Sequence, residues 1–385
     1  MNLIKQFSDR FSKIEPLPEG THHKQAMENE KPYRLHLRLQ KNGAGILIIN
    51  ASTVLQLNPT AAEYAFHFIK GTIPEEAAKQ IAARYRVKKR TALADFGSFS
   101  ERIHTLINTP DLDPTSFLDF DRAAPHSAEL TSPLRLDCAL TYRLPHSSRA
   151  EYAPVKRVER ELTTGEWQSI IDKAWLAGIP HIIFTGGEAT LREDLPALIA
   201  HVEKNGQVCG LLTDGVKLVE KDYLDTLLQT GLDHVMIILE PDDPRSWRAI
   251  HTIVPEDLFL IVHLTINKQN MDQAKNILMK ISELGVKNIS LSTSDNTLID
   301  ETLELQGFAN SLNLNLRWDL PVPYSGSNPV TMETHEENTP SGAGKAWMYV
   351  EPDGDLLPSQ GAAGHIFGNL LRDDWEKISK SASAR

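Results

Sequence analysis

The chain has 385 residues, of which 41% are hydrophobic and 24% charged, and this composition is that of a soluble globular protein. Its length exceeds one ordinary hydrophobic core and predicts about two or three domains. The net charge of −11 argues against a broad nucleic-acid surface, because phosphate binding needs a surplus of Lys and Arg. No signal peptide or membrane span is recognisable, so a cytoplasmic location and no membrane contact are expected.

Cysteine content restricts the chemistry further. The chain contains only Cys138 and Cys209. One chain therefore cannot build a disulfide framework, a multi-cysteine zinc site or an iron-sulfur cubane, which needs three or four thiolates. We expect no metal site.

Residues 33–107 are predicted to form a small winged-helix domain. Alternating side chains between residues 33 and 50 favour two strands joined by a turn. A helix is expected to begin near Pro59, after a cap at Asn58 or Thr60, and to end at Gly71. Two more helices follow.

The rest of the chain divides into three further parts. Residues 108–133 are rich in Pro, Asp, Thr and Ser without a sustained period, which is typical of a linker. Residues 134–320 alternate between apolar strands and helices, which predicts an α/β fold with a parallel sheet, partly or fully closed into a (β/α) barrel. Such folds bind ligands at the carboxyl ends of their strands. Residues 321–385 include a predicted hairpin with its turn at Asp353 and Gly354.

The most specific motif is FTGGEATLREDL at residues 184–195, between a buried strand and a helix. Two glycines often make only a tight strand-to-helix turn. They also allow the backbone to approach a ligand closely, and a carboxylate there can pair with a ligand ammonium group. The spacing alone leaves both interpretations open.

Within residues 134–313 the sequence resembles radical S-adenosylmethionine (SAM) proteins. TGGEATLR is similar to their GGE motif, which contacts the methionyl amino group of SAM, although Ala189 replaces the usual Pro. LLTDG at residues 211–215 resembles the next strand end, and an acidic residue ends the strand after that. The resemblance implies a SAM site formed by Gly186, Gly187, Glu188, Thr213, Asp214 and Glu240.

The cluster-binding cysteines of this family are missing. Aligning residues 140–143, LTYR, with the family pattern puts Leu144, Ser148 and Glu151 at the three cysteine positions. A second alignment beginning at Cys138 still leaves one thiolate. Alkyl and hydroxyl groups cannot replace thiolates on iron, and one carboxylate is a poor substitute. The resemblance therefore implies a degenerate protein without a cluster, and no catalytic residue can be assigned.

Both ends of the chain resemble domains that accompany radical SAM enzymes. Residues 341–361 and FGNLLRDDW are similar to a SPASM-type extension, but Ser341 and Ser359 stand where it carries cysteines. Residues 33–107 resemble PqqD, which binds the leader peptides of ribosomally made, modified peptides. Such domains add the peptide as a strand at a sheet edge, and we expect the strand with Leu37 to supply that edge. A purely structural N-terminal cap is the other interpretation.

Three functions follow from these observations. The first is a non-catalytic or altered partner in peptide maturation that binds a precursor peptide and acts beside an intact radical SAM enzyme. The second is an active enzyme that uses SAM without a cluster, for example in methyl transfer. The third is a DNA-binding regulator that uses the winged helix and the basic run RYRVKKR at residues 84–90, which the acidic chain makes less favourable.

Overall fold

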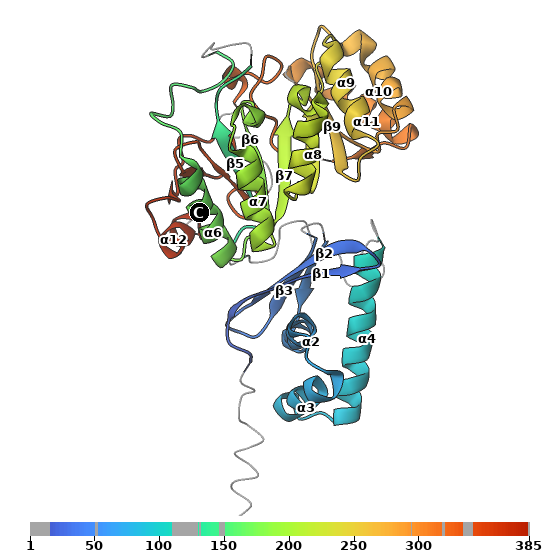
Figure 1. Cartoon of the computed structure of the whole chain (residues 1–385), viewed down its shortest axis with the longest axis vertical. Coiled ribbons are helices and arrows are strands. Elements are labelled where there is room, and N and C mark those ends of the chain that lie inside the picture. Colours follow the sequence, from blue (N-terminus) through green and yellow to red (C-terminus); the bar gives the residue numbers. More distant parts are fainter. Residues whose placement is uncertain are drawn as a thin grey trace, which may run out of the picture. The chain divides into compact units, whose positions relative to one another are not determined.

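The computed structural model describes residues 16–50, 53–109, 130, 132–145, 151–293, 295–317, 320–333 and 342–383. The residues form two compact units, Met1–Ala124 and Pro125–Arg385, called here the N-terminal and C-terminal units (Figure 1). Each unit has its own hydrophobic core. In the part of the chain that is described, no helix combines the length and the apolarity needed to cross a membrane.

The N-terminal unit consists of an antiparallel sheet followed by three helices. Its strands are β1 (Gly20–Glu28), β2 (Lys31–Leu39), β3 (Gly45–Ile49) and β4 (Thr53–Leu57), which lie in that order in the sheet. Its helices are α2 (Pro59–Lys70), α3 (Pro74–Tyr85) and α4 (Lys89–Asn108). Alternate strand positions and the apolar stripes of the helices form one core.

Local capping residues set the bounds of α2. The side chain of Asn58 accepts a hydrogen bond from the backbone N–H of Ala61 at 2.9 Å. Gly71 follows the helix with φ of 65°, a conformation that favours glycine. The structure confirms both predicted ends of this helix.

The sheet edge expected at Leu37 is a wrong prediction. Leu37 lies in β2, which pairs with β1 on one side and β3 on the other, and its side chain is buried in the core. The two edge strands are instead β1 and β4. Strand β1 begins at Gly20, ahead of the predicted domain start, and its mostly polar sequence, GTHHKQAME, carries no hydrophobic alternation.

The C-terminal unit is built on a sheet with the strand order β11-β10-β9-β8-β7-β6-β5-β12-β13-β14. The strands from β5 to β11 are parallel. They are β5 (Arg135–Thr141), β6 (His181–Gly186), β7 (Val208–Thr213), β8 (His234–Ile238), β9 (Phe259–Ile266), β10 (Asn288–Thr293) and β11 (Asn315–Leu316). Because β11 and β14 do not pair with each other, the sheet is an open, partial barrel.

Helices connect successive parallel strands, as the alternating sequence predicts. They are α6 (Thr164–Leu176), α7 (Leu195–Asn205), α8 (Lys221–Gln229), α9 (Pro244–Ile253), α10 (Ala274–Glu283) and α11 (Ile299–Ser311). Apolar side chains from these helices and from every second strand position form the main core. The intervening strand positions, such as Ile183 in β6 and Met236 in β8, form a separate cluster on the other face.

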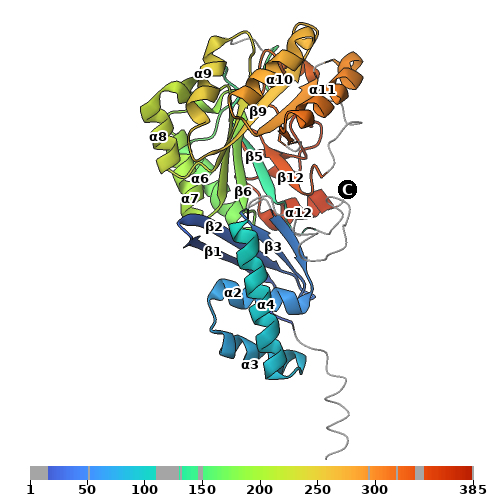
Figure 2. The same cartoon turned by 90° about the vertical axis from the view of Figure 1, so that its right-hand side faces the viewer.

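The C-terminal segment extends the same sheet. Strand β12 (Trp347–Val350) pairs in parallel with β5, as Figure 2 shows, and the sheet therefore continues across the boundary expected at residue 320. The predicted hairpin is present, since β12 pairs antiparallel with β13 (Asp355–Leu357). Strand β14 (Gly368–Asn369) and helix α12 (Trp375–Ser383) complete the segment.

Candidate functional site

A cavity of about 740 Å³ lies at the carboxyl ends of the parallel strands. Its wall includes residues that follow six successive strands: Leu144 and Pro145 after β5, Gly187 and Glu188 after β6, Asp214 after β7, Glu240 after β8, Asn267 after β9 and Asp295 after β10. Residues 323–327 and Pro329 also line it. Parallel α/β folds place their binding sites at this edge.

The structure brings most of the expected ligand-binding residues to this cavity. Four of the six line it: Gly187, Glu188, Asp214 and Glu240. Gly186 and Thr213 are not part of the wall, but both support it. The carbonyl of Gly186 accepts a hydrogen bond from the backbone N–H of Tyr324 at 2.8 Å, and Thr213 donates its hydroxyl hydrogen to Glu188.

Glu188 is almost completely buried, at 3% exposure, and is held by neutral donors. Oε1 accepts hydrogen bonds from the Thr190 N–H at 2.8 Å, the Thr190 hydroxyl at 2.7 Å and the Thr213 hydroxyl at 2.8 Å. Oε2 accepts one from the Asp214 N–H at 2.8 Å. Burial, reinforced by the carboxylate of Asp214, raises the pKa of Glu188 to about 7. A cation in the cavity would stabilise its ionised form.

The two glycines of the motif permit close contact with the loop after β5. The Gly187 N–H donates to the Thr141 carbonyl at 2.8 Å, and the Glu188 N–H donates to the Arg143 carbonyl at 2.9 Å. A Cβ atom at Gly186, where φ is 121°, would lie 2.3 Å from the Thr141 carbonyl oxygen. At Gly187 it would lie 2.4 Å from the Arg143 carbonyl oxygen. Both glycines are therefore required by backbone packing.

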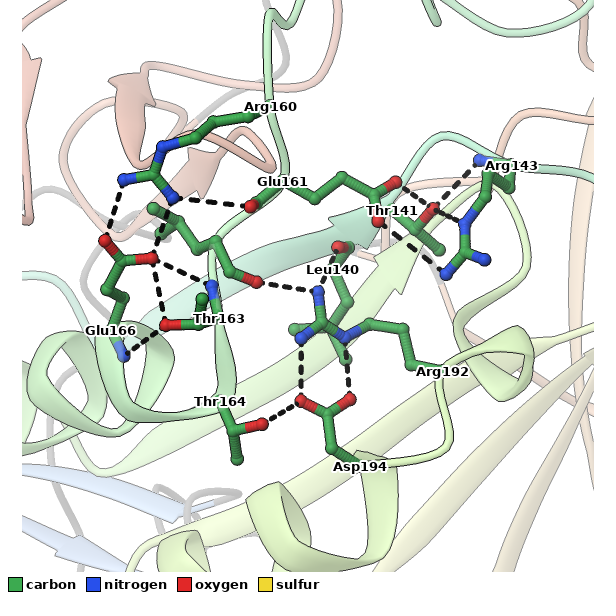
Figure 3. Close-up of polar contacts among 11 residues, drawn as sticks. Leu140, Thr141, Arg143, Arg160, Glu161, Thr163, Thr164, Glu166, Arg192 and Asp194 are labelled. Carbon is green, nitrogen blue, oxygen red and sulfur yellow. Dashed lines mark hydrogen bonds and ion pairs between the residues drawn. The ribbon is translucent and has the colours of Figure 1, made fainter.

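Arg192, the last residue of the TGGEATLR motif, anchors the loop that connects β5 and α6 (Figure 3). Its guanidinium donates to the carbonyls of Leu140 at 3.2 Å and Leu162 at 3.0 Å, which lie at the two ends of that loop. The same group forms a bidentate pair with Asp194 at 2.8 and 2.7 Å. Thr164 donates its hydroxyl hydrogen to Asp194 at 2.6 Å. The motif thus holds the two ends of the loop in which the resemblance places the cluster cysteines.

A second set of contacts closes the same loop (Figure 3). Thr141 donates its hydroxyl hydrogen to Glu161, and Arg143 lies 3.7 Å from the same carboxylate. Farther along, Arg160 forms a bidentate pair with Glu166, at 2.8 and 2.7 Å, on the exposed start of α6. The polar contacts from Thr141 to Glu161 supplement the deeper anchor at Arg192.

The positions that the resemblance assigns to cluster cysteines lie in different environments. Leu144 packs against an apolar cluster that includes Ala139, Tyr142 and Tyr324, and it also lines the cavity. Glu151 is exposed, and Ser359 is half-buried in the turn after β13. The remaining two positions, Ser148 and Ser341, lie outside the described residues.

Both cysteines lie away from the cavity. Cys138 in β5 and Cys209 in β7 are buried in the core between the sheet and its helices. Burial, together with Asp137, raises the pKa of the Cys138 thiol well above its usual value. In the described parts of the chain, no three His, Cys, Asp or Glu side chains are grouped to hold a metal ion.

Sequence reasoning missed the segment 320–333, which contributes to the wall of the cavity. Ser327 donates to both carboxylate oxygens of Glu240, at 2.7 and 2.9 Å. Tyr324 contacts Glu333 by a hydrogen bond, and Glu333 also accepts one from Arg157 at 2.6 Å. These residues are distant in sequence from the strand-end motifs and form no recognisable spacing with them.

An open parallel sheet, with helices packed on it and a cavity at the carboxyl ends of its strands, defines an α/β partial barrel. Residues 138–312, which lie in the C-terminal unit, match the model of the Radical SAM superfamily. The sequence is 30% identical over 178 residues to the PqqA peptide cyclase of Streptomyces rochei. That match covers 42% of this chain and 49% of the cyclase, about half its length.

Solved structures show the same fold. The Streptococcus suis protein SuiB bound to S-adenosylmethionine superimposes with a TM-score of 0.60 at 14% identity, over 93% of this chain and 88% of SuiB. SuiB bound to its precursor peptide SuiA gives a TM-score of 0.59 at 14% identity, over 89% and 86% of the two chains. The predicted α/β barrel fold is confirmed.

Proposed function

We propose that this protein acts in the maturation of a ribosomally made peptide as a non-catalytic or altered member of the radical SAM proteins. The observation that carries this proposal is the position of its two thiols in the fold. The chain has two cysteines, and both are buried in the core between the sheet and the helices, away from the cavity. The cavity wall instead offers Leu144 at one of the expected cluster positions.

An iron-sulfur cluster does not fit these residues. A cubane needs at least three thiolates, and leucine and serine supply none. Glu151 could supply one oxygen ligand, but it is exposed on the loop and has no thiolate beside it in the sequence. We therefore derive no step through a cluster and propose that reductive cleavage of SAM is absent.

S-Adenosylmethionine itself fits the cavity better. Its amino group would pair with the ionised form of Glu188, whose raised pKa reflects burial without a cationic hydrogen-bond donor. Gly187 and Asp214 would lie beside the same ligand. The preserved Glu188 contacts also support the second candidate, an enzyme that uses SAM without a cluster, for example in methyl transfer.

The proposed partner is a precursor peptide that binds the N-terminal unit. Its two edge strands, β1 and β4, carry backbone groups that a peptide strand could extend. SuiB, which shares the fold, has been crystallised with its precursor peptide. We propose a PqqD-like, winged-helix role for this unit, a degenerate SPASM-like role for residues 321–385, and action in the cytoplasm beside an intact radical SAM enzyme.

The regulator hypothesis receives less support from the basic run. Arg84 pairs with the buried carboxylate of Glu63 in α2, with the two groups 2.9 Å apart. That contact gives the first arginine of the run a structural role within the N-terminal unit. The remaining exposed cations lie at the start of α4 and in the turn before it.

Two assays on the full chain test the proposal. After anaerobic incubation with iron, sulfide, a strong reductant and SAM, chromatography should show no reductive SAM cleavage. Titration with candidate precursor peptides, followed by hydrogen exchange, should protect amides of β1 or β4. Reductive cleavage at a rate above that of buffer would overturn the non-catalytic claim, and protection confined to the basic run on adding duplex DNA would favour a regulator.

A further inference from the structure

We propose that the cavity has a second cation subsite, at Glu240, which binds the ammonium or guanidinium group of a lysine or arginine side chain in a peptide. This inference rests on the proposed peptide-maturation function and names the substrate class. The subsite is separate from the one at Glu188, and it gives Glu240 a ligand other than the SAM that the resemblance implies. Because Glu188 and Glu240 follow β6 and β8, with β7 between them, their backbones are roughly 10 Å apart.

Glu240 is half-buried and receives only neutral donors in the described contacts. Ser327 donates to Oε1 at 2.7 Å and to Oε2 at 2.9 Å. The backbone N–H of Glu240 donates to the Ser246 hydroxyl at 3.1 Å, which fixes the strand end that carries the carboxylate. One hydroxyl group is weak compensation for a partly buried negative charge.

The two cations of the cavity wall already have carboxylate partners. Arg245 forms a bidentate pair with Asp243, at 3.0 and 2.7 Å. Lys268 lies 2.7 Å from Asp295. Both cations are thus paired with carboxylates other than Glu240. The wall therefore favours a ligand that carries its own positive charge.

The charges around Glu240 also favour a bound cation. Burial raises the pKa of Glu240, Ser327 lowers it, and the neighbouring carboxylates Asp243, Asp242 and Asp214 raise it further. A bound cation would offset this repulsion and hold Glu240 ionised. Binding should therefore release protons wherever part of Glu240 is protonated.

The walls of the cavity favour an organic cation over a metal ion. Tyr152, Ile238, Pro323 and Tyr324 supply apolar surface that an aliphatic side-chain stem can cover. A metal ion needs several oxygen or nitrogen ligands, and the described residues contain no group of three suitable side chains. The volume of about 740 Å³ also exceeds what a single ion would fill.

The test compares two blocked tripeptides that differ only in their central residue, lysine or the uncharged norleucine, by calorimetry on the full chain. We expect the lysine peptide to bind about tenfold more tightly, as one charge-assisted hydrogen bond predicts. Glu240→Gln should abolish that preference, whereas Glu188→Gln, a matched change at the other carboxylate, should keep it. Binding of the lysine peptide should also release protons. Calorimetry in buffers of different ionisation enthalpy would measure their number.

Equal binding of the two peptides to the wild-type protein, or no binding of either, would overturn the subsite without depending on any variant. A preference for the lysine peptide that survives Glu240→Gln would place the cation elsewhere in the protein, and this result would also contradict the subsite. SAM titration of the same proteins reports on the proposed function separately. Loss of SAM binding with a retained lysine preference would refute the SAM site alone.

Discussion

The turn after β6 and the loop after β5 contact each other at one end of the sheet, yet they differ in what they retain. The turn has the GGE residues and Arg192, and Gly187, Glu188 and Arg192 each form a hydrogen bond to the end of β5 or to the loop after it. Where the resemblance expects three cluster cysteines, the loop has leucine, serine and glutamate. The comparison shows that the motif residues have a packing role. That role does not depend on a cluster.

Arg192→Met should have the largest effect, because it removes the anchor of the loop and leaves Asp194 without its cation. Loss of one partner from a fully buried ion pair typically costs about 3 to 5 kcal/mol of unfolding free energy, and the half-buried position of Asp194 should bring the loss to the lower end of that range. Urea or guanidinium unfolding would measure the change. Arg160→Met removes a bidentate pair of the same kind on the exposed start of α6 and should change stability far less. Equal losses would show that Arg192 is no special anchor.

Substitution of the motif glycines should come next. Gly187→Ala would place a methyl group 2.4 Å from the Arg143 carbonyl oxygen, so the turn and the loop must separate. We expect a loss of about 2 kcal/mol in thermal or denaturant unfolding. Gly307→Ala is the matched control, since the exposed position in α11 has no atom near its added Cβ, and it should stabilise by about 0.5 to 1 kcal/mol. Tolerance of Gly187→Ala would refute the packing role.

The binding role of the same motif depends on Glu188. Glu188→Gln should weaken SAM binding about tenfold to a hundredfold, because it removes one charge-assisted contact to the ligand amino group. Calorimetry on both proteins would measure it. In the wild type, affinity should rise as the pH rises through about 7, where Glu188 ionises, and this rise should vanish in the variant. An unchanged affinity for SAM in the variant would mean that the motif has a packing role but no binding role.

The smallest expected effect for a single step is the pH dependence of stability, at most about 1.4 kcal/mol for each pH unit. The folded-state pKa of Glu188, about 7, lies above its ordinary value of 4.5. Between those values the unfolded chain releases its proton first, so this group makes the protein less stable as pH rises through that window. Unfolding of wild type and Glu188→Gln from pH 4 to 8 would isolate the contribution. A wild-type stability that rises relative to the variant would contradict the raised pKa.

Local sequence signals predicted much of the fold because they act over short distances. Asn58 bounds α2 through its side chain and Gly71 through its left-handed backbone, and the alternation of apolar runs with helical segments predicted the parallel sheet. Strand β1 escaped prediction because its polar residues are paired through backbone bonds to β2, which composition does not encode. Leu37 was consequently assigned to an edge.

The candidate site was predictable only where a motif lies within one strand end. Glu188 and Asp214 fall in such motifs, and both line the cavity. Ser327 and Tyr324 reach it from a segment more than eighty residues beyond β8, so only tertiary folding brings them to Glu240 and Glu333. The anchoring role of Arg192 was hidden for the same reason, since its acceptors lie in other elements.

Iron and sulfide analysis of protein reconstituted anaerobically tests the central claim most directly. The account predicts no stoichiometric cluster and no cubane absorption band, because the loop after β5 supplies no thiolate and both cysteines are buried in the core. The double variant Cys138→Ser, Cys209→Ser should behave in the same way, provided that it folds. About four irons and four sulfides per wild-type chain would contradict the account, and their loss in the double variant would identify the thiols responsible.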